Sequence, residues 1–186
     1  MTELCDLAFK YNTDKCPQIK HHFTEYYHEI FKDKRESVKK VVEIGIGNMT
    51  PGVIGASLYM WREYFHNAEI YGFDINKDIL FSSYRIQTFF CDQTSRKDLY
   101  DLIYHSIRDG VDIDLFVDDG LHTSESQIYT CKMIMPFMKK NSIYAIEDAG
   151  YANTDLLIDE YDVEVFTPGK RRKFKDDRLI IVRQRG

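Results

Sequence analysis

Residues 40–47, KVVEIGIG, decide the fold of this chain, because an apolar run there ends in a glycine turn. From Pro51 onward the apolar residues recur at helical spacing, with Thr50 suited to cap the helix and proline in its first position. A second apolar run follows at residues 68–75. A strand, a helix and a second strand in this order predict a right-handed βαβ unit with parallel strands.

The same alternation of short apolar runs and amphipathic segments continues along the chain. The last two runs differ, because the Pro-Gly loop between them leaves no room for a helix and predicts an antiparallel hairpin. The sequence therefore predicts an α/β fold: a mostly parallel seven-stranded sheet with helices on both faces and a C-terminal antiparallel hairpin, the Rossmann-like architecture of class I methyltransferases. The expected strands are 40–47, 68–75, 85–92, 111–119, 142–148, 162–166 and 177–182.

The composition is that of one globular domain. The chain has 186 residues, 44% hydrophobic and 30% charged, without a repeat or a Pro/Gly/Ser-rich linker. We therefore expect a single domain over residues 1–186, with an N-terminal helical segment, 1–38, before a Rossmann-like core, 39–186. There is no leader-like segment and no apolar run of the roughly 18 residues that a membrane span needs, which predicts a cytoplasmic protein without a membrane partner.

The charge balance bears on the partners of the protein. Asp and Glu number 30 and Lys and Arg 25, so the formal net charge is −5. A generic nucleic-acid binder needs a basic surface to neutralise phosphates, so nucleic acid is not an expected partner. Residues 169–175, GKRRKFK, are a local exception: they are either a solvated loop between strands or a lip that attracts an anionic substrate.

Each predicted parallel strand delivers an acid near its carboxyl end. Ligands of open α/β sheets bind outside the carboxyl ends of the strands, so we expect these acids on one rim. So many carboxylates repel one another unless a cation lies among them. The residues in question are Glu43, Asp74, Asp92, Asp118, Asp119, Glu147 and Asp148, with His122 following the fourth strand.

The turn after the first strand distinguishes two cofactor classes. A dinucleotide fingerprint needs a third glycine at position 50, and that residue is Thr50. The E-x-G-x-G pattern of Glu43, Gly45 and Gly47 instead indicates S-adenosylmethionine (SAM), with glycines that let the backbone approach the cofactor. Asp74, at the end of the second strand, is placed to accept hydrogen bonds from two ribose hydroxyls.

Further cofactor contacts are expected along the same rim. Asp92 and Gln93, after the third strand, are placed to meet the adenine amino group. A strand-end aspartate is also a common turn or helix-cap residue, so each assignment has a structural alternative. The other predicted cofactor contacts are Ile75, Asp118, and, toward the amino-acid end of the cofactor, Thr13 and Lys15.

Several stretches resemble a known family. Residues 116–122, FVDDGLH, resemble the D-D-G-S-H motif of the metal-dependent sugar O-methyltransferases of macrolide biosynthesis, the mycinamicin and macrocin group, with Leu121 replacing serine. Residues 144–148, YAIED, resemble its Y-x-I-E-D motif. The resemblance extends to residues 10–15, KYNTDK, with Asn12 where glycine is usual, and to residues 57–75, SLYMWREYFHNAEIYGFDI.

The resemblance implies that Asp119, Glu147 and Asp148 bind a divalent metal and that His122 is the general base. Carboxylates without thiols are ligands of a hard cation, so Mg²⁺ (or Mn²⁺) is expected rather than zinc. The expected acceptor is a sugar hydroxyl of a glycan, a glycoside or a nucleotide sugar. His21 and His22 lie in a segment that resembles the family's active-site lid, and they are expected near acceptor or cofactor.

Some alternatives stay open at this point. The macrolide enzymes carry a further N-terminal domain for which this chain is too short, so its acceptor can differ. The acids and His122 also suit a catechol-type O-methyltransferase, and a non-catalytic SAM-binding subunit is a third hypothesis. A purely structural interpretation treats Asp118 and Asp119 as a tight turn, but it leaves the second acid pair unexplained. Homo-oligomer formation is not decided by the sequence.

Overall fold

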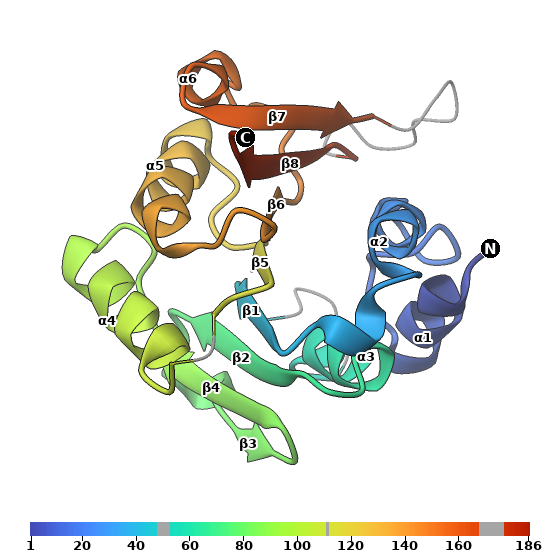
Figure 1. Ribbon diagram of the computed structural model, residues 1–186. Coiled ribbons are helices and arrows are strands. Elements are labelled where there is room, and N and C mark those ends of the chain that lie inside the picture. The colour runs from blue at the N-terminus through green and yellow to red at the C-terminus, as the bar shows by residue number, and fades with distance from the viewer. Residues whose placement is uncertain (48–52, 111, 168–176) are drawn as a thin grey trace.

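A twisted sheet forms the centre of the computed structural model, which describes residues 1–47, 53–110, 112–167 and 177–186. Within these ranges the sheet has eight strands in the order β3-β4-β2-β1-β5-β6-β8-β7 (Figure 1). The strands are β1 (Lys40–Ile44), β2 (Glu69–Asp74), β3 (Ser82–Ser83), β4 (Ile86–Phe90), β5 (Leu115–Asp118), β6 (Ile143–Ile146), β7 (Tyr161–Phe166) and β8 (Leu179–Gln184).

The strand directions confirm the predicted fold class. Strands β4, β2, β1, β5 and β6 pair in parallel, while β8 runs antiparallel to both β6 and β7. The two-residue strand β3 pairs antiparallel with β4 and was not among the seven expected strands. It is a pair of exposed serines, which carry no apolar pattern from which a strand is predicted.

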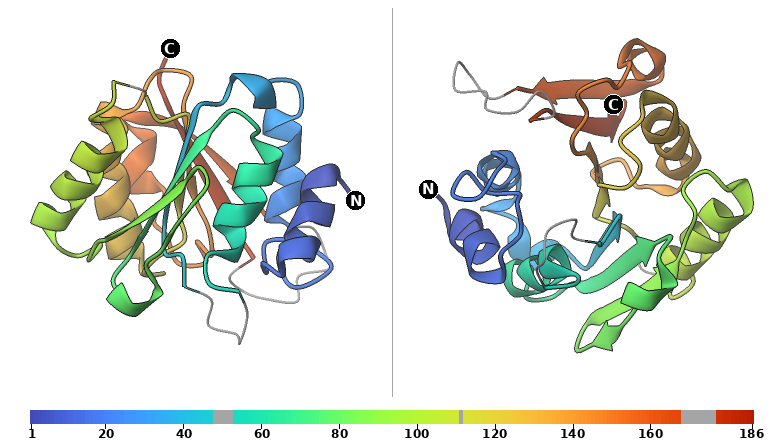
Figure 2. Two further views of the ribbon diagram at one scale, coloured as in Figure 1. Left: turned by 90° about the horizontal axis from the view of Figure 1, so that it is seen from below. Right: turned by 180° about the vertical axis from the view of Figure 1, so that it is seen from behind.

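Helices cover both faces of the sheet (Figure 2). Helices α1, α2 and α3 lie on one face, and α4 and α5 on the other, with α6 beside β7 (Figure 1). The predicted helix after β1 begins at Ala56 in the described chain, and Thr50 and Pro51 lie outside the described residues. The helices are α1 (Glu3–Tyr11), α2 (Phe23–Phe31), α3 (Ala56–Tyr64), α4 (Arg96–Ile107), α5 (Ser124–Ile134) and α6 (Asp155–Ile158), with short 3₁₀ turns at η1 (Arg35–Ser37), η2 (Lys77–Ile79) and η3 (Met135–Phe137).

Two apolar cores sandwich the sheet because the side chains of each strand alternate between its faces. Val41 of β1 packs into the core beneath α1, α2 and α3, whereas Val42 and Ile44 pack into the core beneath α4 and α5. Trp61 of α3 is fully buried in the first of these cores. The parallel strands buried on both faces hold the loops at their carboxyl ends in fixed positions.

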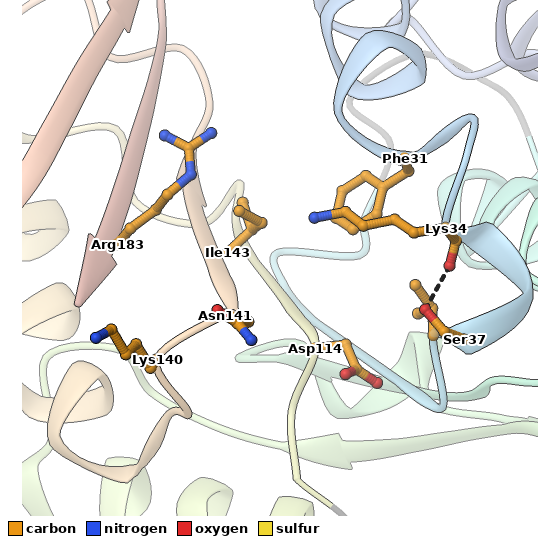
Figure 3. A pocket seen from close by; sticks show the side chains of 9 residues that line it. Phe31, Lys34, Ser37, Asp114, Lys140, Asn141, Ile143 and Arg183 are labelled. Carbon is orange, nitrogen blue, oxygen red and sulfur yellow. Dashed lines mark hydrogen bonds between the residues drawn. The ribbon is translucent and has the colours of Figure 1, made fainter. Parts of the chain in front are cut away.

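A hollow of about 450 Å³ lies where β5 and β6 begin, at the end of the sheet opposite to the carboxyl ends of the parallel strands (Figure 3). It is lined by Lys34, Asp114, Ile143 and Arg183, among others, and Asp114 and Ile143 stand where β5 and β6 begin. It is therefore separate from the acids that follow the parallel strands. None of the helices within the described ranges is long and apolar enough to cross a membrane.

Candidate active site

The carboxyl ends of β1, β2, β5 and β6 meet at one edge of the sheet. Backbone hydrogen bonds continue past the strand ends, from the Gly45 amide to the Phe73 carbonyl at 2.8 Å and from the Asp119 amide to the Ile44 carbonyl at 2.9 Å. The Glu147 amide likewise donates to the Asp118 carbonyl at 3.0 Å. The loops that carry the predicted acids are thus fixed side by side.

Asp119, His122 and Asp148 are partly exposed at this edge. Each offers one ligand atom, and these atoms all lie within 4.8 Å of one another. The His122 Nε2 atom lies 3.8 Å from Oδ1 of Asp119 and 3.9 Å from Oδ2 of Asp148, and its side chain is 42% exposed. Asp148 has a left-handed backbone with φ of 47°, a strained conformation that is common at functional sites. Two carboxylates and an imidazole therefore face a shared space.

Glu147, the third predicted metal ligand, is turned toward the N-terminal segment. Its side chain is buried, and its Oε2 atom contacts the ammonium of Lys15. Its Oε1 atom accepts a hydrogen bond of 2.8 Å from the Tyr27 hydroxyl on α2. Glu147 thus has a protein donor on each of its oxygens, and it shares Lys15 with Asp119.

Lys15 lies among three carboxylates. Its side chain is 1% exposed, and its Nζ atom lies 2.6 Å from Asp119, 3.5 Å from Glu43 and in contact with Glu147. Burial alone lowers the pKa of Lys15, but the attraction of Asp119, Glu147 and Glu43 outweighs it and raises that pKa well above its usual value. Lys15 is therefore a fixed positive charge within the acid cluster. Thr13, predicted beside it, is buried, and its amide donates to the Ala8 carbonyl at 3.0 Å.

Glu43 is held from the α3 side. Its oxygens accept hydrogen bonds of 2.6 Å each from the Ser57 hydroxyl and the Trp61 indole N–H. Burial raises the pKa of Glu43, and the Lys15 ammonium partly offsets this rise. Glu43 thus links β1 to α3 by two hydrogen bonds and lies near Lys15 of the acid cluster.

The turn that follows β1 is tied to Asp74. One carboxylate oxygen of Asp74 accepts from the amides of Ile46 at 2.9 Å and Gly47 at 3.0 Å. Gly45 has φ of +87°, and a Cβ there would lie 2.0 Å from the Asp119 carbonyl oxygen, so this close approach requires glycine. Ile75, next to Asp74, is 63% exposed and presents an apolar side chain at the rim.

A second hydrogen-bond network fixes the turn after β5. The Gln93 amide group donates to Asp118 at 2.7 Å and accepts from the Leu121 amide at 2.7 Å. Tyr144 also donates to Asp118 at 3.0 Å, and burial raises the pKa of Asp118 to about 7. Asp92 accepts hydrogen bonds from the amide and the hydroxyl of Thr94. The side chains of Gln93 and Asp118 are thus hydrogen-bonded to each other and to neighbouring protein groups. Asp92 is hydrogen-bonded within its own turn.

The two predicted histidines of the N-terminal segment differ in burial, since His21 is buried and His22 is partly exposed. His21 lies with Nε2 3.1 Å from Asp148 and Nδ1 3.3 Å from Asp177. His22 lies at the start of α2, where its Nδ1 is 2.9 Å from Glu25. Residues 21–31, HHFTEYYHEIF, which resemble a family stretch, contain both histidines and Tyr27, but the sequence assigned no role to Tyr27 or to Asp177. The basic stretch 169–175 lies outside the described residues.

Comparison with known proteins identifies the relatives of this chain. No family model matches it. Demethylmacrocin O-methyltransferase of Streptomyces fradiae is 34% identical over 147 residues, which are 78% of this chain and 36% of that enzyme. The 8-demethyl-8-alpha-L-rhamnosyl tetracenomycin-C 2'-O-methyltransferase of Streptomyces olivaceus is 32% identical over 147 residues, 78% of this chain and 37% of that enzyme. The chain is homologous to sugar O-methyltransferases.

The homology confirms the resemblance seen in the motifs, and the fold agrees. The chain spans little more than a third of the length of these curated relatives, 36% and 37%. The MycE methyltransferase of the mycinamycin biosynthetic pathway, solved with magnesium, S-adenosylhomocysteine (SAH) and mycinamycin VI, has a TM-score of 0.76 at 23% identity. That match covers 98% of this chain and 54% of MycE, and it confirms the methyltransferase fold.

Proposed function

We propose that the protein is a SAM- and magnesium-dependent O-methyltransferase that transfers a methyl group to a sugar hydroxyl of a glycan, a glycoside or a nucleotide sugar. The observation that carries the proposal is the convergence of Asp119, His122 and Asp148 within 4.8 Å, beside a glycine turn of SAM-binding type. The homologous sugar O-methyltransferases support it.

The donor set fits a hard divalent cation. Carboxylate oxygens of Asp119 and Asp148 face the shared space, and such ligands favour Mg²⁺ or Mn²⁺ over softer metals. We keep Glu147 as the third acid of the predicted set, although it contacts Lys15 and Tyr27. A bound Mg²⁺ supplies positive charge that stabilises the deprotonated form of an acceptor hydroxyl.

His122 is the proposed general base. Its imidazole stands at the rim with 42% of its side chain exposed, close to both Asp119 and Asp148 but beyond hydrogen-bond distance of either. From that place it would accept the proton of the acceptor hydroxyl, whose oxygen would bond to the methyl carbon of SAM. The bond between this carbon and sulfur would break, and S-adenosylhomocysteine would be the leaving group. Binding of both reactants in one orientation supplies much of the remaining rate.

The proposed cofactor site divides into two groups of residues. Gly45, Gly47, Asp74, Ile75 and Asp92 are the residues proposed to contact the cofactor itself, although Asp74 and Asp92 also accept backbone hydrogen bonds from neighbouring turns. The second group shapes the site through bonds to the protein itself; it comprises Thr13, Lys15, Glu43, Gln93 and Asp118.

The proposed partner is a small sugar-bearing acceptor. Neither nucleic acid nor a membrane is a proposed partner, and the proposed location is the cytoplasm. An acceptor screen tests the proposed function. The purified protein is incubated with SAM, Mg²⁺ and a panel of nucleotide sugars, glycosides and catechols, and the product masses are measured by mass spectrometry. We expect a gain of one methyl on a sugar. Methylation of catechols alone contradicts the acceptor class, and SAM binding without any transfer favours a non-catalytic subunit.

A further inference from the structure

The N-terminal segment contacts every acid of the predicted metal set. Lys15 contacts Asp119 and Glu147, Tyr27 donates to Glu147, and His21 lies against Asp148. Glu147, which Lys15 and Tyr27 contact, is buried, whereas Asp119 and Asp148 face the open site. His21 contacts Asp148 on one side of its ring and the buried Asp177 on the other.

The two oxygens of Asp148 point at different partners. Oδ1 lies 3.1 Å from Nε2 of His21, and Oδ2 lies 3.9 Å from both Nε2 of His122 and Nζ of Lys20. The two oxygens of Asp119 also have different partners. Oδ2 lies 2.6 Å from Nζ of Lys15, and Oδ1 lies 3.8 Å from Nε2 of His122. In both acids one oxygen lies against a basic side chain of the N-terminal segment, and the other faces the space where a cation is proposed.

The ring of His21 is itself fixed in position. It is 1% exposed and stacks on Phe23, with ring centroids 4.6 Å apart and planes 4° from parallel. Its Nδ1 atom lies 3.3 Å from the buried Asp177 carboxylate, which also accepts from the His22 amide at 3.3 Å. Ala149, the residue after Asp148, is hydrogen-bonded to the residue after Asp177, since its amide donates to the Arg178 carbonyl at 3.0 Å.

We propose that His21 is a positioning residue of the metal site, which holds Oδ1 of Asp148 so that Oδ2 faces the cation, and that Asp177 holds His21 in turn. This inference rests on the proposed function. Residues that support metal ligands from behind orient them, and their loss typically weakens metal affinity by about 10- to 100-fold. His21 thereby acts behind Asp148 instead of touching acceptor or cofactor.

The test measures metal affinity directly. Mn²⁺ binding is titrated by electron paramagnetic resonance in the unmodified protein, in His21→Ala and in His21→Gln, whose side-chain amide offers Asp148 a polar N–H group in place of the imidazole. We expect His21→Ala to weaken Mn²⁺ binding by about 10- to 100-fold and His21→Gln to recover most of the loss. SAM affinity, followed in parallel, is expected to stay unchanged in both variants.

A matched control and a second variant complete the experiment. His28→Ala removes a half-buried histidine of α2 that contacts Tyr64 at 3.0 Å, and it should leave Mn²⁺ binding unchanged. Asp177→Asn should weaken Mn²⁺ binding in the same direction as His21→Ala, and it carries the test if the latter does not fold. Equal Mn²⁺ affinity in these variants and the unmodified protein overturns the role of His21, whereas absence of Mn²⁺ binding in the unmodified protein overturns the proposed function itself.

Discussion

Replacement of His122 by alanine separates catalysis from structure at this site. The side chain is 42% exposed, and its Nε2 atom lies 3.8 Å and 3.9 Å from the two nearest acids, neither distance being a hydrogen bond. Loss of such an exposed side chain changes the free energy of unfolding by about 0.5 kcal/mol or less. Loss of a general base lowers turnover by about 10²- to 10⁴-fold, or about 2.7–5.4 kcal/mol in activation free energy.

The assay follows methyl transfer to the best acceptor under saturating SAM, with Mn²⁺ affinity measured alongside. We expect His122→Ala to lose at least 100-fold in kcat and to keep its affinities for SAM and Mn²⁺. The matched control is His66→Ala, since His66 is an exposed histidine next to Glu36 and far from the rim. Retained turnover in His122→Ala refutes the base, and a parallel loss of Mn²⁺ affinity shows that the imidazole is a metal ligand instead.

The other predictions concern the supports of the site and its metal. Gly45→Ala should lower the free energy of unfolding by about 2–5 kcal/mol in a urea titration, because the new Cβ meets the Asp119 carbonyl oxygen at 2.0 Å in a left-handed conformation; an unchanged midpoint contradicts that geometry. Trp61→Phe removes the 2.6 Å hydrogen bond to the buried Glu43 and should cost about 1–3 kcal/mol in the same titration, whereas no change would show that Glu43 is satisfied otherwise. EDTA should abolish methyl transfer and Mg²⁺ should restore it best; activity that is indifferent to EDTA removes the metal from the mechanism.

The sheet was predictable because its signal is local. Buried parallel strands are short apolar runs, and each of the seven expected strands is present, although most are shorter than predicted. Residues 111–119 were expected as a strand, for example, but the paired residues are Leu115–Asp118. Helix α1 lies in the expected N-terminal helical segment, 1–38, but its bounds were not predicted, although Thr2 caps it and Leu4, Cys5 and Ala8 share its buried face.

The rim was predictable from topology, and the partners of its residues were not. Parallel strands end at one edge, so Asp119 and Asp148 were expected to meet there. No sequence pattern links Lys15 to Asp119, 104 residues later, or to Glu147, 132 residues later. The glycine signature likewise gives no sign that Asp74 accepts hydrogen bonds from the same turn.

Location of a bound ion tests the central claim most directly. A crystal of the protein grown with SAH and Mn²⁺ would be measured at a wavelength where manganese scatters anomalously. We predict one anomalous peak at a ligand distance of about 2 Å from carboxylate oxygens of both Asp119 and Asp148. A map without a peak between these two acids, at saturating Mn²⁺, would contradict the account.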